Sequence, residues 1–563
     1  MNYLRKASLF VLALCLLFSC KDDDSMAARN ERLIEYFAFE GVDPAAEGEI
    51  NHTDGTVRLT VPFGTNRSAL QPTIRVSEGA SIDPPSGEPQ DFRNFAIYTV
   101  TGADGLKKTY TVLVAEGLSN NARLTSFKLP TLFQTGVINQ ETNEISLEVF
   151  YGTDLSALTA ALVPAETGAT ISPSPSTPQN FSQPVTYTVT APDGQSTETY
   201  TVRVSVLPEE TGIRGVWITN VDSDVLNSQA NIQAAVDRMA ELNLNTAFVV
   251  TYNKALTTYP SQVMKNLTGV EINPLYAGRD PLREFIDAAH AKNIKVFAWF
   301  EYGFAANNGS PGPILQAKPN WGAINNAGNQ VVKNGFYWLN SLHPEVQEFM
   351  TELVLETVRN YPDMDGVQGD DRLPAMPTEG GYDAYTVEKY KAEHNGQAPP
   401  NDPKDGFWIQ WRANILNAYG QDLYNRVKAI NPSSIVAMSP SPMNFGLVEY
   451  LQDYPAWVKG GYADLVSPQL YRRDTQGISI YRGLLSEQLN QVGNEHVDKF
   501  YPGILSYLGG YVPDPEFMVA MVKENRRRGV TGEVHFFYNA LLSYPEVFRA
   551  IYPAPAIYPN LLE

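Results

Sequence analysis

Two patterns of apolar and polar residues divide this chain near residue 208. Before that point, short runs of β-branched and aromatic residues alternate with polar ones, which is typical of strands with one buried face. After it, continuous apolar runs alternate with stretches of helical period, as expected for βα units around a parallel sheet. We therefore predict two kinds of domain in one chain.

The N-terminal part contains an internal repeat. Phe92 and the segments 98–101, 104–105 and 110–112 recur as Phe181 and the segments 187–190, 193–194 and 200–202. Each copy joins two alternating runs through an Asp-Gly turn, which favours a β-hairpin. We predict two small β-sandwiches at residues 29–117 and 118–208, similar to the immunoglobulin-like modules of bacterial surface lipoproteins. Without a cluster of exposed aromatic residues, a spacer role is favoured over carbohydrate binding.

The C-terminal part, residues 209–563, contains eight candidate strands. They are residues 215–220, 246–253, 295–304, 364–370, 434–439, 464–471, 500–505 and 533–539. Apolar stripes of helical period lie between them, for example Ile232, Ala235, Val236 and Met239. This pattern predicts an α/β TIM (β/α)8 barrel with long loops after its third and fourth strands. A doubly wound sheet is the rival, but residues 220–223 lack the Gly-rich phosphate turn that such a sheet carries after its first strand.

The first residues form a targeting segment. Arg5 and Lys6 precede an apolar run, residues 9–18, that is too short to span a bilayer. The run ends in Leu-Phe-Ser-Cys, which resembles a lipoprotein cleavage box, so we predict a signal peptide at residues 1–19 and lipidation of Cys20. The acidic residues that follow, within a tether at 20–28, are similar to a tag that directs lipoproteins to the outer surface. We therefore expect an outer-membrane lipoprotein on the cell surface or the periplasmic face.

Charge and cysteine content exclude several classes of function. The formal net charge of -20 argues against a nucleic-acid partner, because phosphate binding requires clustered Lys and Arg. The basic run 526–528 is interpreted as the solvated last turn of a helix. Both cysteines, Cys15 and Cys20, lie in the targeting segment, so the mature chain has no disulfide.

The histidines and the known catalytic motifs exclude further chemistries. The six histidines show no metal-ligand spacing, and His535 is interpreted as a core residue. The chain has no Walker loop, no G-x-S-x-G motif and no nucleophilic cysteine. We predict no metal and no cofactor, which leaves carboxylate chemistry.

Carboxylates stand at the ends of two neighbouring predicted strands. Asp370 and Asp371 end the fourth strand after Gly369, and Glu301 lies near the end of the third. In a β/α barrel, this edge of the sheet carries the active site. Hydrolysis of a glycosidic bond requires one carboxylic acid and a second carboxylate as nucleophile or base. A lone Asp at a strand end more often caps a loop, but two adjacent Asp after a glycine favour function.

We predict roles for these residues on that basis. Asp370 is the nucleophile or base, and Asp371 or Glu301 is the acid. Gly369 leaves room for a ligand. Gln469 and Tyr471 position the sugar, and Trp299 and Tyr302 are walls. The full set of predicted substrate-binding residues is Trp217, Asn220, Tyr252, Trp299, Tyr302, Trp338, Gln469, Tyr471, Asp474 and Tyr507.

A family resemblance covers the whole C-terminal part. Seven segments, 214–217, 259–261, 296–300, 338–340, 343–346, 365–371 and 467–471, resemble in order the glycosyl-hydrolase-like family ten. The resemblance implies a TIM barrel and an O-glycosyl hydrolase with the aspartate pair at its centre. Members of that family include an outer-membrane lipoprotein that cleaves peptidoglycan glycan strands lacking stem peptides. This chain departs from the pattern at residues 372–374, which replace a tyrosine-rich run, and at Glu301, which stands where an Asn is common.

The leading hypothesis is a monomeric, lipid-anchored glycoside hydrolase that acts on peptidoglycan strands or a polysaccharide. The alternative is a non-catalytic carbohydrate-binding surface lipoprotein on a barrel scaffold. The two spacer domains and the two departures from the family pattern favour the alternative. A separation of the paired carboxylates far outside about 5–9.5 Å would also favour it.

Overall fold

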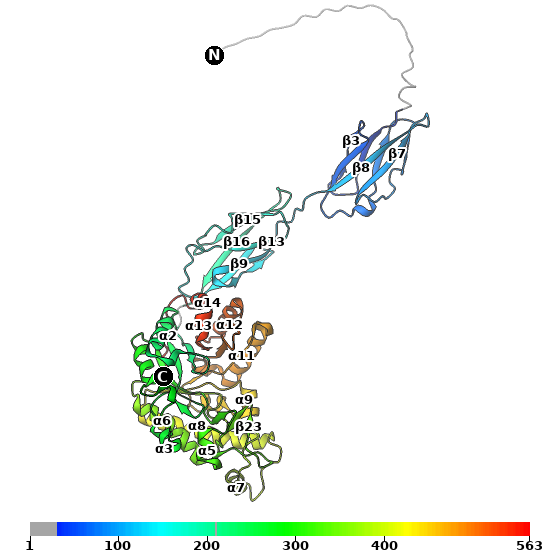
Figure 1. Cartoon of the computed structure of the whole chain (residues 1–563). Helices are drawn as coiled ribbons and strands as arrows, with labels where there is room; N and C mark the ends of the chain where they lie inside the picture. Colours follow the sequence, from blue (N-terminus) through cyan, green and yellow to red (C-terminus); the bar gives the residue numbers. More distant parts are fainter. Residues whose placement is uncertain (1–30, 209–210, 563) are drawn as a thin grey trace, which may run out of the picture.

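The computed structural model of the protein describes residues 31–208 and 211–562. The predicted signal peptide, the tether and the lipidation site Cys20 lie outside these residues. Figure 1 shows two β-rich regions in succession, followed by a larger α/β region. Every helix within the described ranges is too short or too polar to cross a membrane.

Each β-rich region consists of a three-stranded and a five-stranded sheet. In the first region the sheets have the strand orders β2-β1-β5 and β3-β4-β8-β7-β6, and in the second β10-β9-β13 and β11-β12-β16-β15-β14. The strands of the first are β1 (Ile34–Phe39), β2 (Ala46–Glu47), β3 (Glu49–Asn51), β4 (Thr56–Val61), β5 (Thr73–Val76), β6 (Ser81–Asp83), β7 (Phe95–Thr101) and β8 (Lys107–Glu116). Those of the second are β9 (Leu124–Leu129), β10 (Gln134–Thr135), β11 (Val137–Asn139), β12 (Glu144–Val149), β13 (Ala161–Pro164), β14 (Thr170–Ser172), β15 (Val185–Thr190) and β16 (Thr197–Val206).

The two regions are therefore copies of one strand order, each with its own hydrophobic core. The predicted hairpins are present: β7 pairs with β8 and β15 with β16 in antiparallel register. Gly105 and Gly194 of the Asp-Gly turns have φ values of +76° and +72°, a left-handed conformation that glycine adopts without steric cost.

The α/β region contains one curled sheet of eight parallel strands. They are β17 (Arg214–Ile218), β18 (Thr246–Val250), β21 (Lys295–Phe300), β25 (Gly366–Gly369), β26 (Ile435–Met438), β27 (Leu465–Val466), β28 (Gly503–Leu505) and β29 (Glu533–Phe536). Neighbours in sequence are neighbours in the sheet, and the first strand, β17, pairs with the last, β29. Isolated parallel bridges, Val466 with Phe500 and Gln469 with Gly503, link the ends of β27 and β28. This arrangement is compatible with the predicted TIM barrel.

All eight predicted strands exist, but most end earlier than their patterns suggested. β27 contains only Leu465–Val466, and β21 stops at Phe300. The residues beyond these ends remain apolar or buried because loops cover them, so hydrophobicity alone does not mark the last ladder hydrogen bond. The carboxylates Glu301, Asp370 and Asp371 therefore follow the strands, whereas Trp217 and Trp299 lie within them.

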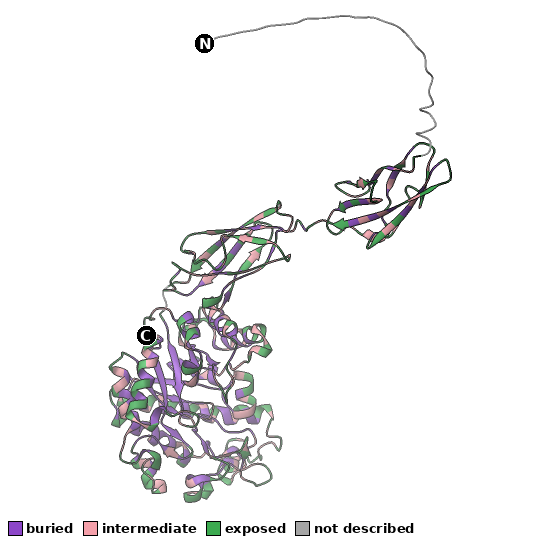
Figure 2. Cartoon of the chain, turned by 45° about the horizontal axis from the view of Figure 1, so that its top comes forward, coloured by how far each residue is buried: buried purple, intermediate pink, exposed green. Residues whose placement is uncertain are grey.

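Helices alternate with the strands. They are α2 (Gln229–Glu241), α4 (Pro281–His290), α6 (Pro344–Asn360), α8 (Gly406–Ile430), α10 (Tyr454–Lys459), α11 (Ile478–Val492), α12 (Pro515–Arg527) and α14 (Pro545–Ile551). The predicted stripe of α2 is buried, and Asp280 caps α4 by accepting a hydrogen bond from the Arg283 N–H. Figure 2 shows the sheet buried and the outer helix faces exposed.

Further elements lie in the loops at the C-terminal ends of the strands. They are β19 (Tyr252–Asn253), β20 (Leu256–Thr257), α3 (Gln262–Thr268), β22 (Ala305–Asn308), α5 (Gly312–Ala317), β23 (Val332–Lys333), β24 (Phe336–Trp338), α7 (Ala384–Glu393), α9 (Met443–Tyr450) and α13 (Asn539–Ser543). The long loops predicted after the third and fourth strands hold β22, α5, β23, β24 and α7.

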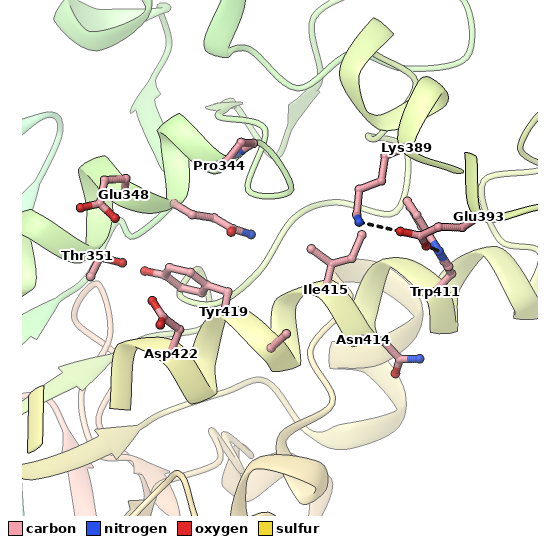
Figure 3. Close-up of a pocket in the computed structure, with 12 residues that line it drawn as sticks. Pro344, Glu348, Thr351, Lys389, Glu393, Trp411, Asn414, Ile415, Tyr419 and Asp422 are labelled. Atoms are coloured by element: carbon pink, nitrogen blue, oxygen red, sulfur yellow. Dashed lines mark hydrogen bonds and ion pairs between the residues drawn. The ribbon is translucent and has the colours of Figure 1, made fainter. Parts of the chain in front are cut away.

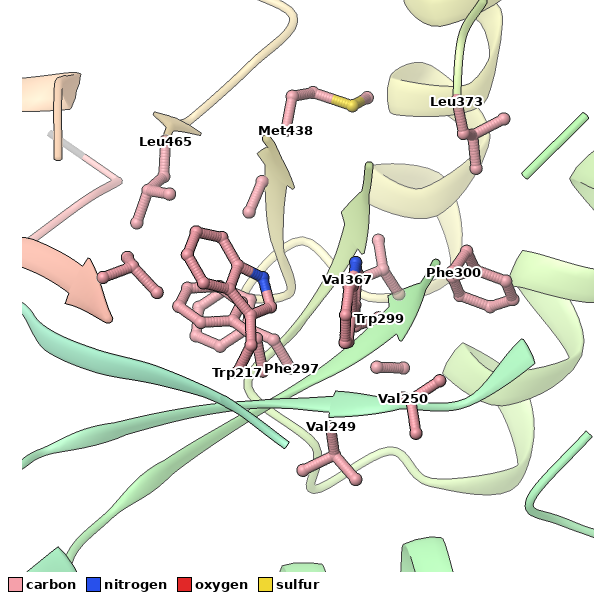
Figure 4. Close-up of a cluster of buried hydrophobic side chains, with 14 of the residues drawn as sticks. Trp217, Val249, Val250, Phe297, Trp299, Phe300, Val367, Leu373, Met438 and Leu465 are labelled. Atoms are coloured by element: carbon pink, nitrogen blue, oxygen red, sulfur yellow. The ribbon is translucent and has the colours of Figure 1, made fainter. Parts of the chain in front are cut away.

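Aromatic side chains fill the inside of the curled sheet. Trp217 lies 5.9 Å from Phe248 and 6.3 Å from Trp299, measured between ring centroids, and Phe248 lies 4.9 Å from Phe297. Figure 4 shows Trp217, Phe297 and Trp299 packed together beneath Met438 and Leu465. This packed layer supports the site above it.

The second β-rich region also packs against the α/β region. Lys523 of α12 donates hydrogen bonds to the Glu148 carbonyl (2.6 Å) and to Gln134 Oε1 (2.8 Å). Arg527 forms a 3.0 Å ion pair with the Glu148 carboxylate, and Phe150 belongs to the core of the α/β region. In Figures 1 and 2 the first β-rich region is joined to the second by a short stretch of chain.

Candidate active site

The ends of the third and fourth strands bring three carboxylates together. β21 ends at Phe300 and is followed by Glu301. β25 ends at Gly369 and is followed by Asp370 and Asp371. Because Phe300 and Gly369 are paired in parallel register, all three residues leave the same edge of the sheet. We call Glu301, Asp370 and Asp371 the carboxylate cluster.

Asp370 is held by side chains from neighbouring strand ends. It is 4% exposed. Ser439 Oγ and Gln469 Nε2 donate hydrogen bonds of 2.9 and 2.7 Å to its Oδ1. Its Oδ2 lies 3.5 Å from Arg372 Nη1. The carboxyl group therefore has a fixed orientation at the bottom of the site.

Burial changes the acidity of two members of the cluster. It raises the pKa of Asp370 well above its ordinary value, and the charges of Asp371 and Glu301 add to this while Arg372 opposes it. Burial also raises the pKa of Glu301, against the opposing effects of Arg372 and a hydrogen bond from Asn253. A raised carboxyl pKa keeps a proton available at higher pH, as a general acid requires.

Arg372 supplies positive charge inside the cluster. Its Nη1 lies 3.1 Å from Asp371 Oδ1 and donates a 2.9 Å hydrogen bond to the Glu301 carbonyl. Its guanidinium lies 4.5 Å from the ring centroid of Phe336 and 5.7 Å from that of Tyr302. Aromatic faces attract a cation and hold the guanidinium in place. Three carboxyl groups around one arginine favour retention of a proton within the cluster.

A turn after Gly369 separates the two aspartates. The Leu373 N–H donates a 3.0 Å hydrogen bond to the Asp370 carbonyl, so the chain turns directly after the strand. The side chain of Asp370 is 5% exposed and that of Asp371 is 26% exposed. A Cβ at residue 369 would collide with the Leu373 carbonyl and approach Met438 Sδ to 2.8 Å. Our expected reason for Gly369 is therefore wrong: the glycine fits the turn, not a ligand.

A cavity of about 560 Å³ opens beside Asp371, and we call it the mouth cavity. It is lined by Asp371, Ser441, Pro442, Asn444, Phe445, Gln469, Tyr471, Arg472, Leu484 and Glu487. Its volume is in the range of about 300–1,000 Å³ that is usual for ligand sites. Phe445 is 53% exposed, so its ring is available for stacking on a sugar. Three predicted site residues, Asp371, Gln469 and Tyr471, thus share one cavity.

Amide side chains connect Glu301 to a second cavity. Asn253 Nδ2 donates hydrogen bonds to Glu301 Oε2 (3.0 Å) and to Asn220 Oδ1 (2.6 Å). Asn220 and Tyr507, both predicted to bind substrate, line a cavity of about 710 Å³ beside β17 and β29. A series of hydrogen-bonded polar side chains, Glu301, Asn253 and Asn220, therefore connects the carboxylate cluster to this second cavity.

Four predicted binding residues lie in the packed interior. Trp217, Tyr252, Trp299 and Trp338 are each at most 1% exposed. Trp217 Nε1 donates a 2.7 Å hydrogen bond to Gln368, so we assign Trp217 to the core. Tyr252 Oη, Trp299 Nε1 and Trp338 Nε1 are buried without a hydrogen-bond partner among the described residues. Buried polar atoms of this kind are common where a ligand or water binds.

The remaining predicted residues support the walls. Tyr302 is 5% exposed and packs against Phe336 and Arg372. The Asp474 carboxylate accepts hydrogen bonds from Tyr511 Oη (3.1 Å) and the Asp514 N–H (3.2 Å). These bonds join two loops, so Asp474 is a loop anchor rather than the substrate-binding residue that the sequence predicts.

Another groove lies on the outer helices, between α6 and α8, with a volume of about 620 Å³. Figure 3 shows Glu348 and Tyr419 on one side of it and Glu393 and Trp411 on the other. Its Glu348 pairs with Arg426, and Glu393 pairs with Lys389 and accepts a hydrogen bond from Trp411. A groove whose carboxylates are neutralised in this way is less suited to acid–base chemistry than the mouth cavity.

Several residues of the site are not among those predicted from the sequence. Ser439 directly follows the fifth strand, so the rule applied to Asp370 would have found it. Asn253 was placed within a strand that ends before it. Phe445 and Arg472 come from a helix and a loop whose position depends on tertiary packing.

Metal chemistry has no evident ligands in this part of the chain. Within residues 31–208 and 211–562, no group of three or more His, Cys, Asp or Glu side chains is arranged to hold an ion. The histidine at the last strand, His535, is 0% exposed and hydrogen-bonded, which confirms its interpretation as a core residue.

In comparisons with known proteins, the two parts of the chain match two different family patterns. The pattern described as "SGBP, N-terminal" matches residues 34–114 and again 124–204, the two β-rich regions. The pattern described as "Glycosyl hydrolase-like 10" matches residues 212–513, more than half of the chain. The second match includes every member of the carboxylate cluster.

Among named relatives, "Glycosyl hydrolase DigH" of Escherichia coli (strain K12) is 26% identical over 359 residues, covering 54% of this chain and 76% of that protein. "Glycosyl hydrolase YngK" of Bacillus subtilis (strain 168) is 24% identical over 398 residues, covering 62% of this chain and 73% of that protein. The glycoside hydrolase domain of PgaB (BpsB) from Bordetella bronchiseptica aligns with a TM-score of 0.46 at 14% identity, covering 61% of this chain and 99% of that domain.

The family match and both relatives support the predicted class of enzyme, a glycosidase. Four of the seven segments that carry the sequence resemblance, 214–217, 296–300, 365–371 and 467–471, lie in strands of the curled sheet or directly at their C-terminal ends. This chain belongs to the glycosyl hydrolase-like 10 family.

Proposed function

We propose that this chain is a glycoside hydrolase that cleaves an O-glycosidic bond with the carboxylate cluster at the edge of a closed TIM barrel. The observation that carries the proposal is the meeting of Glu301, Asp370 and Asp371 around Arg372 at the ends of two adjacent strands, with Asp371 lining the mouth cavity. Pairing of β17 with β29 and the bridges between the ends of β27 and β28 support closure of the barrel.

Burial and hydrogen bonding suggest a division of roles. Glu301 is the general acid, because burial raises the pKa of its carboxyl group. Asp371 is the nucleophile or base, because it lines the cavity and is paired with Arg372. Asp370, which the sequence predicts to be the nucleophile or base, is instead a positioning residue: it is 4% exposed and its Oδ1 accepts hydrogen bonds from Ser439 and Gln469.

The substrate is a glycan of the bacterial envelope or of the surroundings, either peptidoglycan strands or a polysaccharide. Support comes from the exposed ring of Phe445 beside the mouth cavity, since aromatic rings stack on the apolar faces of sugars. The two β-rich regions, which we propose to be immunoglobulin-like spacers, would hold the enzyme away from the membrane. Their two-sheet architecture supports that assignment.

The test is release of reducing ends from peptide-free peptidoglycan strands and a panel of polysaccharides. We expect Glu301→Gln and Asp371→Asn each to lower kcat by about 10²–10⁴-fold, the usual contribution of a general acid or base. Asp422→Asn is the matched control, since Asp422 lies in the outer groove with its side chain 62% exposed, and it should retain full activity.

Two outcomes would contradict the proposal. Hydrolysis by Glu301→Gln and Asp371→Asn at the wild-type rate would exclude the cluster as the catalytic group. Binding of a glycan by the wild-type chain with no turnover on any substrate would favour the alternative, a carbohydrate-binding lipoprotein.

We also propose that Cys20 carries a lipid and anchors the protein in the outer membrane. Support is limited to the sequence, where Cys20 ends an apolar segment with the residues of a lipoprotein box. Metabolic labelling with a radioactive fatty acid should mark the wild-type chain, and Cys20→Ser should remain unlabelled. A labelled Cys20→Ser chain would overturn the anchor assignment.

A further inference from the structure

Arg472 is a cation of the mouth cavity that forms no ion pair with a carboxylate among the described residues. It lines the cavity together with Asp371 and Gln469. Its Nη1 donates a 2.7 Å hydrogen bond to the carbonyl of Tyr471, its own neighbour in the chain. No ion pair joins Arg472 to a carboxylate in the part of the chain that the structure describes. Arg372, by contrast, is paired with both aspartates of the cluster.

Partial burial of the Arg472 side chain makes the absence of an ion-pair partner unfavourable. Burial lowers the pKa of the Arg472 guanidinium, and the charge of Glu487 only partly opposes this. A cation that has lost part of its hydration is stabilised strongly by an anion that can reach it. The guanidinium carries five N–H donors in a planar fork, and the bond from Nη1 to the Tyr471 carbonyl engages one of them.

Glu487 is the carboxylate of this cavity that could have neutralised Arg472. Its Oε1 instead accepts a hydrogen bond from Asn444 Nδ2, and it forms no ion pair with Arg472 in the described structure. Both residues line the cavity without pairing with each other. A bound anion would have to contact Arg472 and stay away from Glu487 and Asp371.

Resting on the proposed hydrolase function, we propose that Arg472 binds a carboxylate of the glycan, so that the enzyme prefers an acidic sugar unit close to the cleaved bond. Arginine forms paired, parallel hydrogen bonds to a carboxylate, which gives both strength and orientation. Phe445 lines the same cavity with its ring 53% exposed, so it offers a stacking face for the same sugar. Arg472 is thus a specificity-determining residue rather than part of the proton-transfer machinery.

Two kinds of sugar carry such a carboxylate. A uronic acid bears it on C6 of the ring, and muramic acid bears it on a lactyl ether at C3. The test therefore uses two glycans, polygalacturonate and peptide-free peptidoglycan strands, each in its native form and after chemical reduction of the carboxylates to alcohols. The reduced forms keep the linkage and lose only the charge.

The variants are Arg472→Gln, Arg472→Lys and the matched control Arg473→Gln. Arg473 is the next residue, is exposed, and lies with its guanidinium 4.4 Å from the ring centroid of Tyr511. We expect Arg472→Gln to lower kcat/KM on the preferred native glycan by about ten- to a hundredfold, chiefly through KM. Arg472→Lys should retain part of the preference, and Arg473→Gln should behave as wild type.

On the carboxyl-reduced glycan, the wild type should fall to the level of Arg472→Gln, and the variant should show no further loss. Which native glycan shows the effect identifies the source of the carboxylate. Equal activity of the wild type on native and reduced forms of both glycans, or an equal loss by Arg472→Gln on both forms, would overturn the proposal.

Binding measured by calorimetry separates this proposal from the proposed function. Glu301→Gln, used as a non-hydrolysing background, should bind the native glycan at least tenfold more tightly than Glu301→Gln combined with Arg472→Gln. Carboxylate-dependent binding without turnover by the wild type would refute the hydrolase and leave the anion site standing. Turnover with carboxylate-independent binding would refute the anion site alone.

Discussion

Two buried carboxylates of the α/β region, Asp370 and Glu533, differ in their electrostatics. Both are almost inaccessible, at 4% and 0% exposure. Burial raises the pKa of Asp370 well above its ordinary value. For Glu533, burial also acts in the raising direction, but the Arg526 charge and hydrogen bonds outweigh it and the pKa is lowered. The carboxyl group is thus stabilised in its protonated form at Asp370 and in its ionised form at Glu533.

The difference lies in how completely each charge is compensated. Glu533 accepts hydrogen bonds from Arg526 Nη1 (2.8 Å) and Nη2 (2.9 Å), from Asn525 Nδ2 (2.9 Å) and from Tyr552 Oη. Asp370 has an arginine at 3.5 Å that it shares with Asp371. Removing one partner of a fully compensated buried pair destabilises the fold, whereas an incompletely compensated carboxyl group beside cavity-lining residues is typical of an active site.

Among the variants that test this comparison, we expect Glu533→Gln to have the largest effect on the stability of the fold. The substitution removes the negative charge that faces Arg526 in the interior, and breaking a buried pair costs about 3–5 kcal/mol. We expect the free energy of unfolding, measured by urea denaturation, to fall by that amount. Glu516→Gln on α12, the helix that carries Arg526, is the control. The Glu516 side chain is 47% exposed, and the variant should change stability by less than about 1 kcal/mol. Equal stabilities of the two variants would contradict the assignment.

A smaller effect is expected from the pH dependence of stability. His535 hydrogen-bonds Ser506 Oγ (2.8 Å) and Tyr552 Oη (2.7 Å), and burial lowers its pKa to about 4 against the opposing charge of Glu533. Since the unfolded chain takes up the proton near pH 6.5, the folded state loses stability as pH falls from 6.5 towards 4. Each pH unit in that window costs about 1.4 kcal/mol, or roughly 3 kcal/mol in all.

The measurement is the unfolding free energy of the wild type and His535→Gln at pH 7, 6, 5 and 4.5. The variant lacks the titrating ring, so its stability should fall less steeply over that range. Parallel curves for the two proteins would show that His535 does not titrate as described.

The sequence predicts the sheet well because its physical signals are local. Eight apolar runs separated by helical stripes are enough to indicate eight parallel strands with helices between them, and each of the eight exists. The Asp-Gly turns of the repeat likewise specify the hairpins around Gly105 and Gly194. Positions at strand ends then lead to Glu301, Asp370 and Asp371 as neighbours.

Such local patterns do not predict which carboxylate of the site takes which role. Whether Asp370 or Asp371 faces the cavity depends on the turn closed by Leu373, and that turn depends on a hydrogen bond and close packing after the strand. The strand has already ended at Gly369, so strand alternation does not decide between the two aspartates.

The sequence pattern also does not predict ion pairs between distant segments of the chain. The run 526–528 reads as a solvated helix end, yet the Arg526 side chain is 6% exposed and paired with Glu533. That interpretation was wrong for Arg526 because β29 brings a buried carboxylate against the end of α12. Arg472 and Phe445 escaped prediction for the same reason, since a loop and a separate helix place them in one cavity.

The most direct test of the account is the unfolding free energy and activity of Asp370→Asn, measured beside Glu533→Gln. Because Asp370 is buried with its charge incompletely compensated, Asp370→Asn should lower kcat by about 10²-fold or more while leaving stability unchanged or raised. Glu533→Gln should lose stability instead. A loss of 3 kcal/mol or more in Asp370→Asn, or wild-type activity in that variant, would contradict the division between a carboxylate that positions the active site and one that stabilises the fold.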